Sequence, residues 1–191
     1  EEYLAIYPPE NLTKSAAISV GDGLYAWATE RLARLMANKG VDTFLYRFDH
    51  SPQWAKEREL YAFHTCELVY TFNNVKNNKK FSPNWGCIHD STEDNNMAEV
   101  ISDYWVSFAA SGIPQKPDLP VWGRYSSDER SFMRFQDGCA RPEDSLCPDM
   151  FNLHEKIVTK RRETNRDWTY KNIGWLAPET GSLNDPEINK G

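Results

Sequence analysis

A long amphipathic segment followed by a short aromatic one constrains the fold of this chain most. From Asp22 to Asn38 apolar residues recur at helical spacing, and Gly40 follows as a left-handed stop. Residues 43–48 are short, aromatic and bounded by polar residues, which predicts a β-strand. A helix, a short connection and a strand in this order are typical of an α/β protein. The apolar stripe of this helix consists of Leu24, Trp27, Ala28, Leu32, Leu35 and Met36.

Two further helices are predicted downstream, with little additional strand. We expect Asn96 to cap a helix over residues 97–111, with Glu99 completing a capping-box-like pair and Gly112 ending the helix. A last helix is expected from about Pro148 to Arg162, and residues 131–135 predict one short strand. Residues 164–191 are polar with a few aromatic and aliphatic positions, so we interpret them as a tail that docks on a surface.

Composition limits the class of protein. With 191 residues and 40% hydrophobic content the chain can form one domain, or a large piece of a bigger one. No apolar run approaches the roughly 18 residues that a membrane-spanning helix needs. The formal net charge of −6 argues against nucleic acid as a partner, because binding a phosphate backbone requires a basic face.

Four cysteines, an even number, allow two disulfides in three connectivities. Cys66 and Cys87 bracket one loop, and Cys139 and Cys147 bracket another; neither pair has the spacing typical of a zinc site. Local disulfides would place the protein outside the cytosol, secreted or periplasmic. The chain opens without a signal peptide, so we expect any targeting segment to have been removed or to lie upstream.

The four histidines differ in setting. We interpret His154, beside the apolar stripe of the last helix, as a packed or capping residue, and His50 and His89 as solvated loop residues. His64 lies in a loop after the predicted strand. That is the setting in which a histidine base can shuttle a proton for a serine nucleophile.

Five short segments carry a recognisable pattern in order along the chain. They are Gly21-Asp22 with Ala33 to Leu35; Phe44-x-Tyr46-Arg47-Phe48; Phe63-His64-x-x-Glu67-Leu68-x-Tyr70-x-Phe72; Asp103 to Ala109 with Gly112 and Pro114; and Leu119-Pro120-x-Trp122-x-x-Tyr125. Together they resemble the type-B carboxylesterase, lipase and cholinesterase family over about residues 3–160. The third segment is similar to the one that carries the catalytic histidine in that family.

The resemblance implies that the chain is the C-terminal portion of an α/β-hydrolase fold, with the last sheet strands and their packing helices. On this interpretation residues 1–191 belong to a single domain that is incomplete on its own. His64 would be the general base of a Ser-His-acid triad in carboxylic ester hydrolysis. Glu67 would support the hydrogen-bond network behind the site. Cys66 could tether the histidine loop through Cys87. No cofactor or metal is implied, since serine esterase chemistry needs neither.

Two departures from the family pattern bear directly on the site. Thr65 stands where the family usually has glycine after the histidine, which affects the conformation of the loop. The Gly-x-Ser-x-Gly elbow of a serine esterase and a glycine run for an oxyanion hole are both absent from the sequence. We therefore expect the nucleophilic serine, the acid and the oxyanion hole to come from an upstream segment or partner chain, with a small ester as substrate.

Two other classes of function remain open at this point. One is a cholinesterase-like adhesion or scaffold protein that keeps the fold without the chemistry. The other is a freestanding aromatic-rich binding module, for example for carbohydrate, that would use tryptophans, although such residues more often pack in cores or interfaces. The tryptophans considered for this role are Trp85, Trp122, Trp168 and Trp175.

Overall fold

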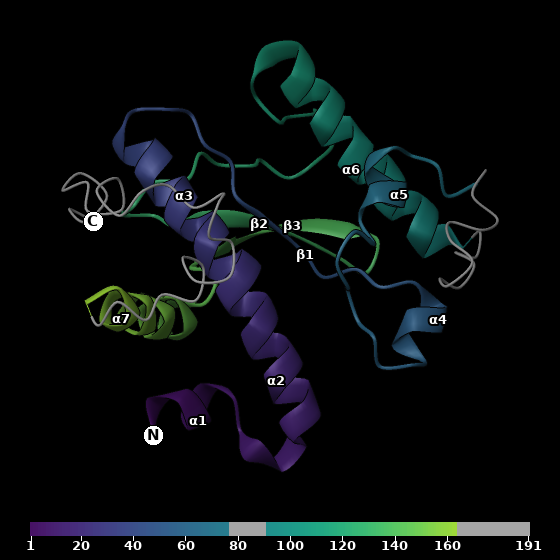
Figure 1. Cartoon of the computed structure of the whole chain (residues 1–191). Helices are drawn as coiled ribbons and strands as arrows, with labels where there is room; N and C mark the ends of the chain where they lie inside the picture. The colour runs from purple at the N-terminus through teal and green to yellow at the C-terminus, as the bar shows by residue number, and fades with distance from the viewer. Residues whose placement is uncertain (77–90, 164–191) are drawn as a thin grey trace, which may run out of the picture. The chain divides into compact units, whose positions relative to one another are not determined.

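The computed structural model describes residues 1–76 and 91–163 of the chain (Figure 1). These residues form two compact units. One contains residues 43–146, and the other combines residues 1–42 with the segment from 147 onward. That both belong to a single domain stays a prediction, and the expected docking tail, 164–191, lies outside the described residues. None of the described helices combines the length and apolar content needed to cross a membrane.

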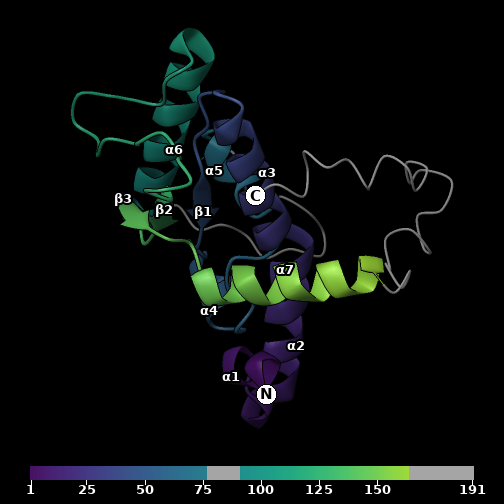
Figure 2. The same ribbon diagram turned by 90° about the vertical axis from the view of Figure 1, so that its left-hand side faces the viewer.

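The unit of residues 43–146 is built on a three-stranded sheet in the order β1-β2-β3 (Figure 2). Strand β1 (Tyr46–Phe48) pairs in parallel with β2 (Ser131–Gln136), which pairs antiparallel with β3 (Cys139–Asp144). The strand predicted at 43–48 is confirmed for Tyr46–Phe48; residues 43–45 precede it, and Leu45 O accepts from Met133 N at 2.9 Å. The sheet is mixed and small, consistent with part of an α/β fold.

Helix α6 (Thr92–Ser111) packs on this sheet and on the short helix α5 (Leu68–Thr71). Its buried positions Met97, Ile101 and Tyr104 follow the predicted helical spacing. Gly112 adopts the left-handed conformation expected of its stop, with φ of 75°. The core buried between helix and sheet consists of Val69, Tyr70, Val75, Met97, Ala98, Ile101, Tyr104, Trp122, Met133, Phe135 and Ala140.

The other unit is helical. Helix α2 (Leu12–Gly21), the π-helical turn η2 (Asp22–Ala26) and α3 (Trp27–Asn38) follow one another without a break (Figure 1). The same unit contains α1 (Glu2–Ile6), the 3-10 turn η1 (Pro9–Asn11) and α7 (Pro148–Glu163). Arg31 and Trp27 of α3 both donate to Glu155 of α7, at 2.7 and 2.8 Å, which joins the two helices.

Three predictions about these elements were wrong. Helix α6 begins at Thr92 with Ser91 as its cap, because the Ser91 hydroxyl accepts from Asp94 N at 3.0 Å; Asn96 lies inside the helix. Residues 139–144 form strand β3 rather than a loop, since Asp137 and Gly138, both with positive φ, close a tight hairpin. The helical run of the other unit begins at Leu12, ten residues before the predicted start.

Candidate active site

His64 lies on a tight turn between the short helix α4 (Gln53–Lys56) and α5. The turn continues into α5 through successive backbone hydrogen bonds, from Cys66 N to Phe63 O and from Leu68 N to Thr65 O, at 3.1 and 3.2 Å. His64 is exposed in the described structure, whereas the residues that follow it turn inward: Cys66 and Val69 are buried. The backbone thus presents the imidazole outward from a turn that is fixed on the core.

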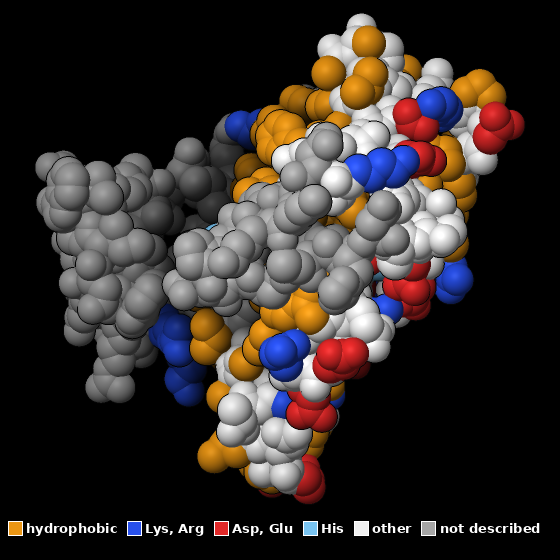
Figure 3. All heavy atoms as spheres, turned by 90° about the vertical axis from the view of Figure 1, so that its right-hand side faces the viewer, with side chains coloured by type: hydrophobic (Ala, Val, Ile, Leu, Met, Phe, Trp, Pro, Cys, Tyr) orange, Lys and Arg blue, Asp and Glu red, His pale blue; other side chains and the backbone are white. Residues whose placement is uncertain are grey.

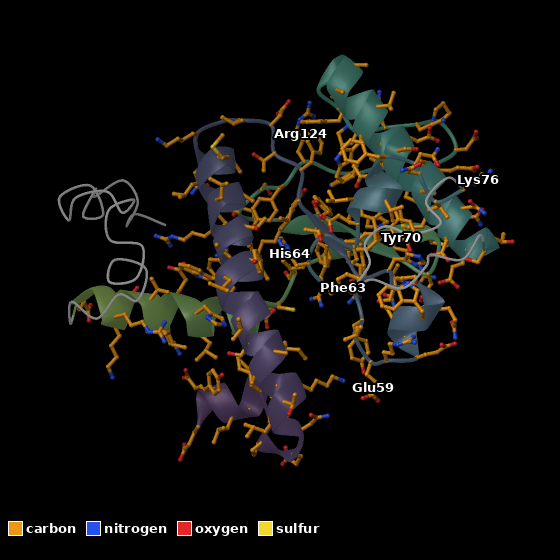
Figure 4. All side chains as sticks on the ribbon, turned by 45° about the vertical axis from the view of Figure 1, so that its right-hand side comes forward. Glu59, Phe63, His64, Tyr70, Lys76 and Arg124 are labelled. Carbon is orange, nitrogen blue, oxygen red and sulfur yellow. The ribbon has the colours of Figure 1, made fainter. Side chains whose placement is uncertain are left out.

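The residues on either side of His64, Phe63 and Cys66, pack inward and hold the turn. The Phe63 ring packs on Trp54 of α4, with 5.7 Å between ring centroids, and Trp54 is itself only 9% exposed. On the other side burial raises the pKa of the Cys66 thiol to about 12, with the charge of Glu67 adding to the effect. Cys66 therefore stays a protonated thiol at neutral pH and packs as an apolar residue rather than acting as a nucleophile. Figure 4 shows Phe63, His64 and Tyr70 along this stretch.

Thr65 occupies a conformation that suits glycine. Its φ is 71°, in the left-handed region where a β-branched residue is rarely found. Two other residues of the same loop, Glu59 and Tyr61, also have positive φ, at 53° and 51°. Backbone strain of this kind is concentrated at functional sites. Thr65 thus adds a β-branched side chain at a position whose backbone conformation favours glycine.

Glu67 is half-buried and starts α5, since its carbonyl accepts from the backbone N–H groups of Tyr70 and Thr71 at 3.0 and 2.9 Å. Its charge also contributes, after burial, to the raised pKa of the Tyr46 hydroxyl. The structure thus places Glu67 three residues after His64, at the N-cap of α5. Its supporting role remains a prediction.

A buried cluster lies behind this turn, and sequence reasoning missed it. His50, expected to be solvated, is 1% exposed and its Nε2 donates to Asp94 Oδ1 at 2.9 Å. The Tyr70 hydroxyl donates to the same oxygen at 2.7 Å, and the Ser91 hydroxyl donates to Oδ2 at 2.6 Å. The capping spacing Ser91-x-x-Asp94 was the available signal. His50 is buried because its ring packs on Phe48 and Tyr70, with centroid separations of 6.1 and 4.9 Å.

Of the other histidines and tryptophans considered for a site, two are packed in the interior and the rest lie outside the described residues. His154 is packed as expected, 7% exposed, with its Nε2 3.0 Å from the Tyr7 hydroxyl. His89 and Cys87 lie outside the described residues. Trp122 is a core residue, 6% exposed, whose indole N–H donates to Leu45 O at 3.0 Å. Trp85, Trp168 and Trp175 also fall outside the described part of the chain.

Cys66 and Cys139 are free thiols, so the expected Cys139–Cys147 disulfide is absent from the structure. The reason is the strand β3, which begins at Cys139 and carries the chain away from it by about 3.3 Å per residue. A disulfide instead requires the two Cα atoms to lie within about 7 Å.

No triad is assembled among the described residues. Several serine hydroxyls are engaged in local hydrogen bonds: Ser15 donates to Pro8 O at 2.6 Å and Ser107 to Ile113 O at 2.8 Å. Ser19 accepts from the Tyr3 hydroxyl at 2.7 Å. Within residues 1–76 and 91–163 there is also no cluster of side chains that could hold a metal ion.

The mixed sheet, its packing helices and the outward histidine on a turn after the parallel strand define part of an α/β-hydrolase fold. Two solved structures share it. An esterase from Clostridium hathewayi matches with a TM-score of 0.53 and 17% identity over 65% of this chain and 23% of its own. A thermophilic PNB esterase matches with a TM-score of 0.50 and 22% identity over 60% of this chain and 22% of its own.

The sequence profile of the Carboxylesterase family matches residues 3–149. The chain belongs to this family. It is 28% identical over 135 residues to Carboxylesterase 4A from Bos taurus, covering 68% of this chain and 23% of that protein. It is 24% identical over 134 residues to the cocaine esterase of Homo sapiens, covering 68% and 22%. The chain thus spans less than a quarter of the length of these relatives.

Proposed function

We propose that this chain supplies the histidine base of a serine carboxylesterase. His64 takes the proton of a serine hydroxyl as it attacks the ester carbonyl, and then gives it to the leaving alkoxide. The serine, the acid and the oxyanion hole come from an upstream segment or partner chain. The observation that carries the proposal is His64 itself: an exposed imidazole on a turn fixed from both sides, within the stretch that matches the family.

Exposed apolar surface supports the need for a further segment. The apolar stripe predicted on residues 22–38 is not the buried face of its helix: Leu24 and Leu32 are 48% and 59% exposed, while Glu30 and Ala33 are buried. Hydrophobic side chains also reach the surface on the face drawn in Figure 3. Such patches mark surfaces that another polypeptide covers. We infer that this polypeptide is an upstream segment of the same esterase, because the relatives are much longer than this chain.

The test uses a fluorophosphonate ester, which labels an activated serine, on the natural protein analysed by mass spectrometry. We expect one label per molecule or complex on a serine outside this chain. The His64→Gln variant should lose labelling and kcat by roughly 10⁴-fold. The control is Glu57→Gln, which changes an exposed residue of the same loop and should leave both unchanged.

Two results would contradict the proposal. If His64→Gln keeps the labelling rate of the parent, His64 is not the base. If the folded natural protein takes up no label, a cholinesterase-like adhesion or scaffold role becomes the better account. Trp122 is buried in the core, so it cannot serve as a ligand-binding residue of a tryptophan-based binding module.

We extend the proposal to location, as a secreted or periplasmic enzyme. The free thiols of Cys66 and Cys139 give no support to this assignment, whereas the sequon Asn11-Leu12-Thr13 is compatible with it. Asn11 lies at an exposed helix start, where its side-chain oxygen accepts from Lys14 N at 3.1 Å. A mass decrease on deglycosylation of the natural protein would support export; unmodified Asn11 with four free thiols would count against it.

A further inference from the structure

The carboxylate of Asp94 is the meeting point of three donors in the unit of residues 43–146. It is 3% exposed and accepts from His50 Nε2, the Tyr70 hydroxyl and the Ser91 hydroxyl at 2.9, 2.7 and 2.6 Å. Asp94 lies in the first turn of α6, where the helix dipole favours a negative charge. Burial alone would raise the pKa of this carboxyl, but the bonds from His50, Ser91 and Tyr70 outweigh it and lower the pKa. The group is therefore a buried, fully hydrogen-bonded carboxylate.

The first two donors come from the two ends of one segment. His50 lies two residues after β1, and Tyr70 lies in α5. Their rings also pack edge to face, with centroids 4.9 Å apart and an interplanar angle of 88°. Because His50 and Tyr70 both donate to Asp94 and pack on each other, the two ends of the segment 50–70 lie side by side, and the residues between them form a loop. His64 is in this loop, six residues before Tyr70.

The link from Tyr70 back to His64 is short and stiff. Tyr70 N bonds to Glu67 O at 3.0 Å and Leu68 N to Thr65 O at 3.2 Å, so the turns between these residues are continuous. A hydroxyl that fixes Tyr70 therefore also fixes the base of the turn that carries the imidazole. The ring of Tyr70 is 0% exposed, so its hydroxyl has no access to solvent as a substitute partner.

We propose that Asp94 is a positioning residue for the catalytic histidine, holding both ends of the His64 loop on the start of α6 through His50 and Tyr70. This rests on the proposed role of His64 as base. The physical reason is that proton transfer tolerates little misplacement: a shift of about 1 Å can cost roughly 100-fold in rate. A loop with strained residues at Glu59, Tyr61 and Thr65 needs such an external anchor to keep one conformation.

The experiment compares three variants of the natural protein by steady-state kinetics on a small ester, by fluorophosphonate labelling rate and by melting temperature. Tyr70→Phe removes only the hydroxyl that donates to Asp94. Asp94→Asn replaces one acceptor oxygen by an NH₂ group that faces donors. Tyr104→Phe is the matched control, because it also removes one hydroxyl bond of a 0% exposed tyrosine, from Tyr104 to Pro120 O at 2.6 Å, away from the His64 loop.

We expect Tyr70→Phe and Asp94→Asn to lower kcat and the labelling rate by roughly 10- to 100-fold. KM should change little, because Tyr70 and Asp94 are both buried. Tyr104→Phe should lower the melting temperature about as much as Tyr70→Phe and keep the parent kcat. Measurements are made at a temperature at which every variant is folded by circular dichroism; if Asp94→Asn does not fold, Tyr70→Phe carries the comparison.

The inference is overturned if Tyr70→Phe keeps the parent kcat, or if Tyr104→Phe loses kcat equally. In either case the Asp94 cluster serves stability alone. Failure of the proposed function has a different signature, since His64→Gln would then label at the parent rate. If His64→Gln abolishes labelling but Tyr70→Phe labels at the parent rate, the proposed function stands. Only the positioning role of Asp94 is then wrong.

Discussion

At the residue scale, the backbone conformation of Thr65 lowers the stability of the folded chain. A left-handed backbone costs an L-residue about 1–2 kcal/mol, and Thr65 has φ of 71°. Glycine removes that cost but loses about 0.5–1 kcal/mol of entropy on folding. We therefore expect Thr65→Gly to raise the free energy of unfolding by about 0.5–1 kcal/mol, measured by urea denaturation.

The matched control is Thr71→Gly, in the helix α5, where the hydroxyl donates to Glu67 O at 3.1 Å. There glycine relieves no strain, loses that bond and should lower stability by about 1 kcal/mol. If the two substitutions have effects of the same sign, the argument from backbone strain at Thr65 is wrong.

His154 gives a pH dependence at the same scale. Burial lowers the pKa of this imidazole below its usual 6.5; Asp22 opposes the shift and Arg161 adds to it. The unfolded chain thus takes up a proton at a pH where the folded chain does not, so stability rises with pH in this range. We expect stability to fall from about pH 7.5 to about pH 5.5, and to fall less in His154→Gln. Parallel stability curves for the two proteins would exclude this contribution.

At the element scale, two glycines of the helical run from Leu12 to Asn38 make a matched pair. A Cβ at Gly21 would meet nothing within 4 Å, whereas one at Gly23 would lie 3.0 Å from His154 Cε1. The ring of His154 has little freedom to move, because its Nε2 is 3.0 Å from the Tyr7 hydroxyl. Gly21→Ala should stabilise by about 0.5–1 kcal/mol through helix propensity.

Gly23→Ala should instead lower stability by about 1 kcal/mol, because overpacking against the imidazole outweighs the gain in propensity. Both variants can be compared by thermal and urea unfolding of the natural protein. If Gly23→Ala is stabilising to the same degree as Gly21→Ala, His154 moves aside freely and is not held by Tyr7 as the distance indicates.

Helices and strands were predictable from the sequence where the spacing of apolar residues and the positions of glycines matched the packing seen in the structure. Helix α7 and the ends of α3 and α6 followed from apolar spacing and from Gly40 and Gly112. Strand β3 was missed because its residues are polar and include a proline, and only the Asp137-Gly138 turn reveals the hairpin. The motif around His64 predicts a catalytic role, which stays a prediction. The burial of His50 could not be predicted, because it depends on Tyr70 and Asp94, 20 and 44 residues away in the chain.

At the scale of the whole molecule, the described residues leave two features that a complete esterase would cover. Strand β1 pairs with β2 on one side, and among residues 43–76 and 91–146 no strand pairs with its other edge. Large apolar side chains are also strongly exposed, with Leu12, Phe72 and Val121 at 71%, 76% and 81%. Unpaired edges and apolar patches promote association. On the proposed function, an upstream segment of the esterase covers both features.

The 191-residue chain produced alone is therefore expected to associate. Light scattering coupled to size exclusion should give a mass above 22.1 kDa, and a dye that binds apolar surface should fluoresce. Deuterium exchange of the β1 amides should be fast in the chain alone and slow in the natural protein, because a strand of the upstream segment protects them. Leu32→Glu should weaken association, while Asn38→Glu, exposed on the same helix, should not. If the chain is instead monomeric, binds no dye and protects the β1 amides by itself, this part of the fold is stable without another segment. The argument for an upstream partner would then be wrong.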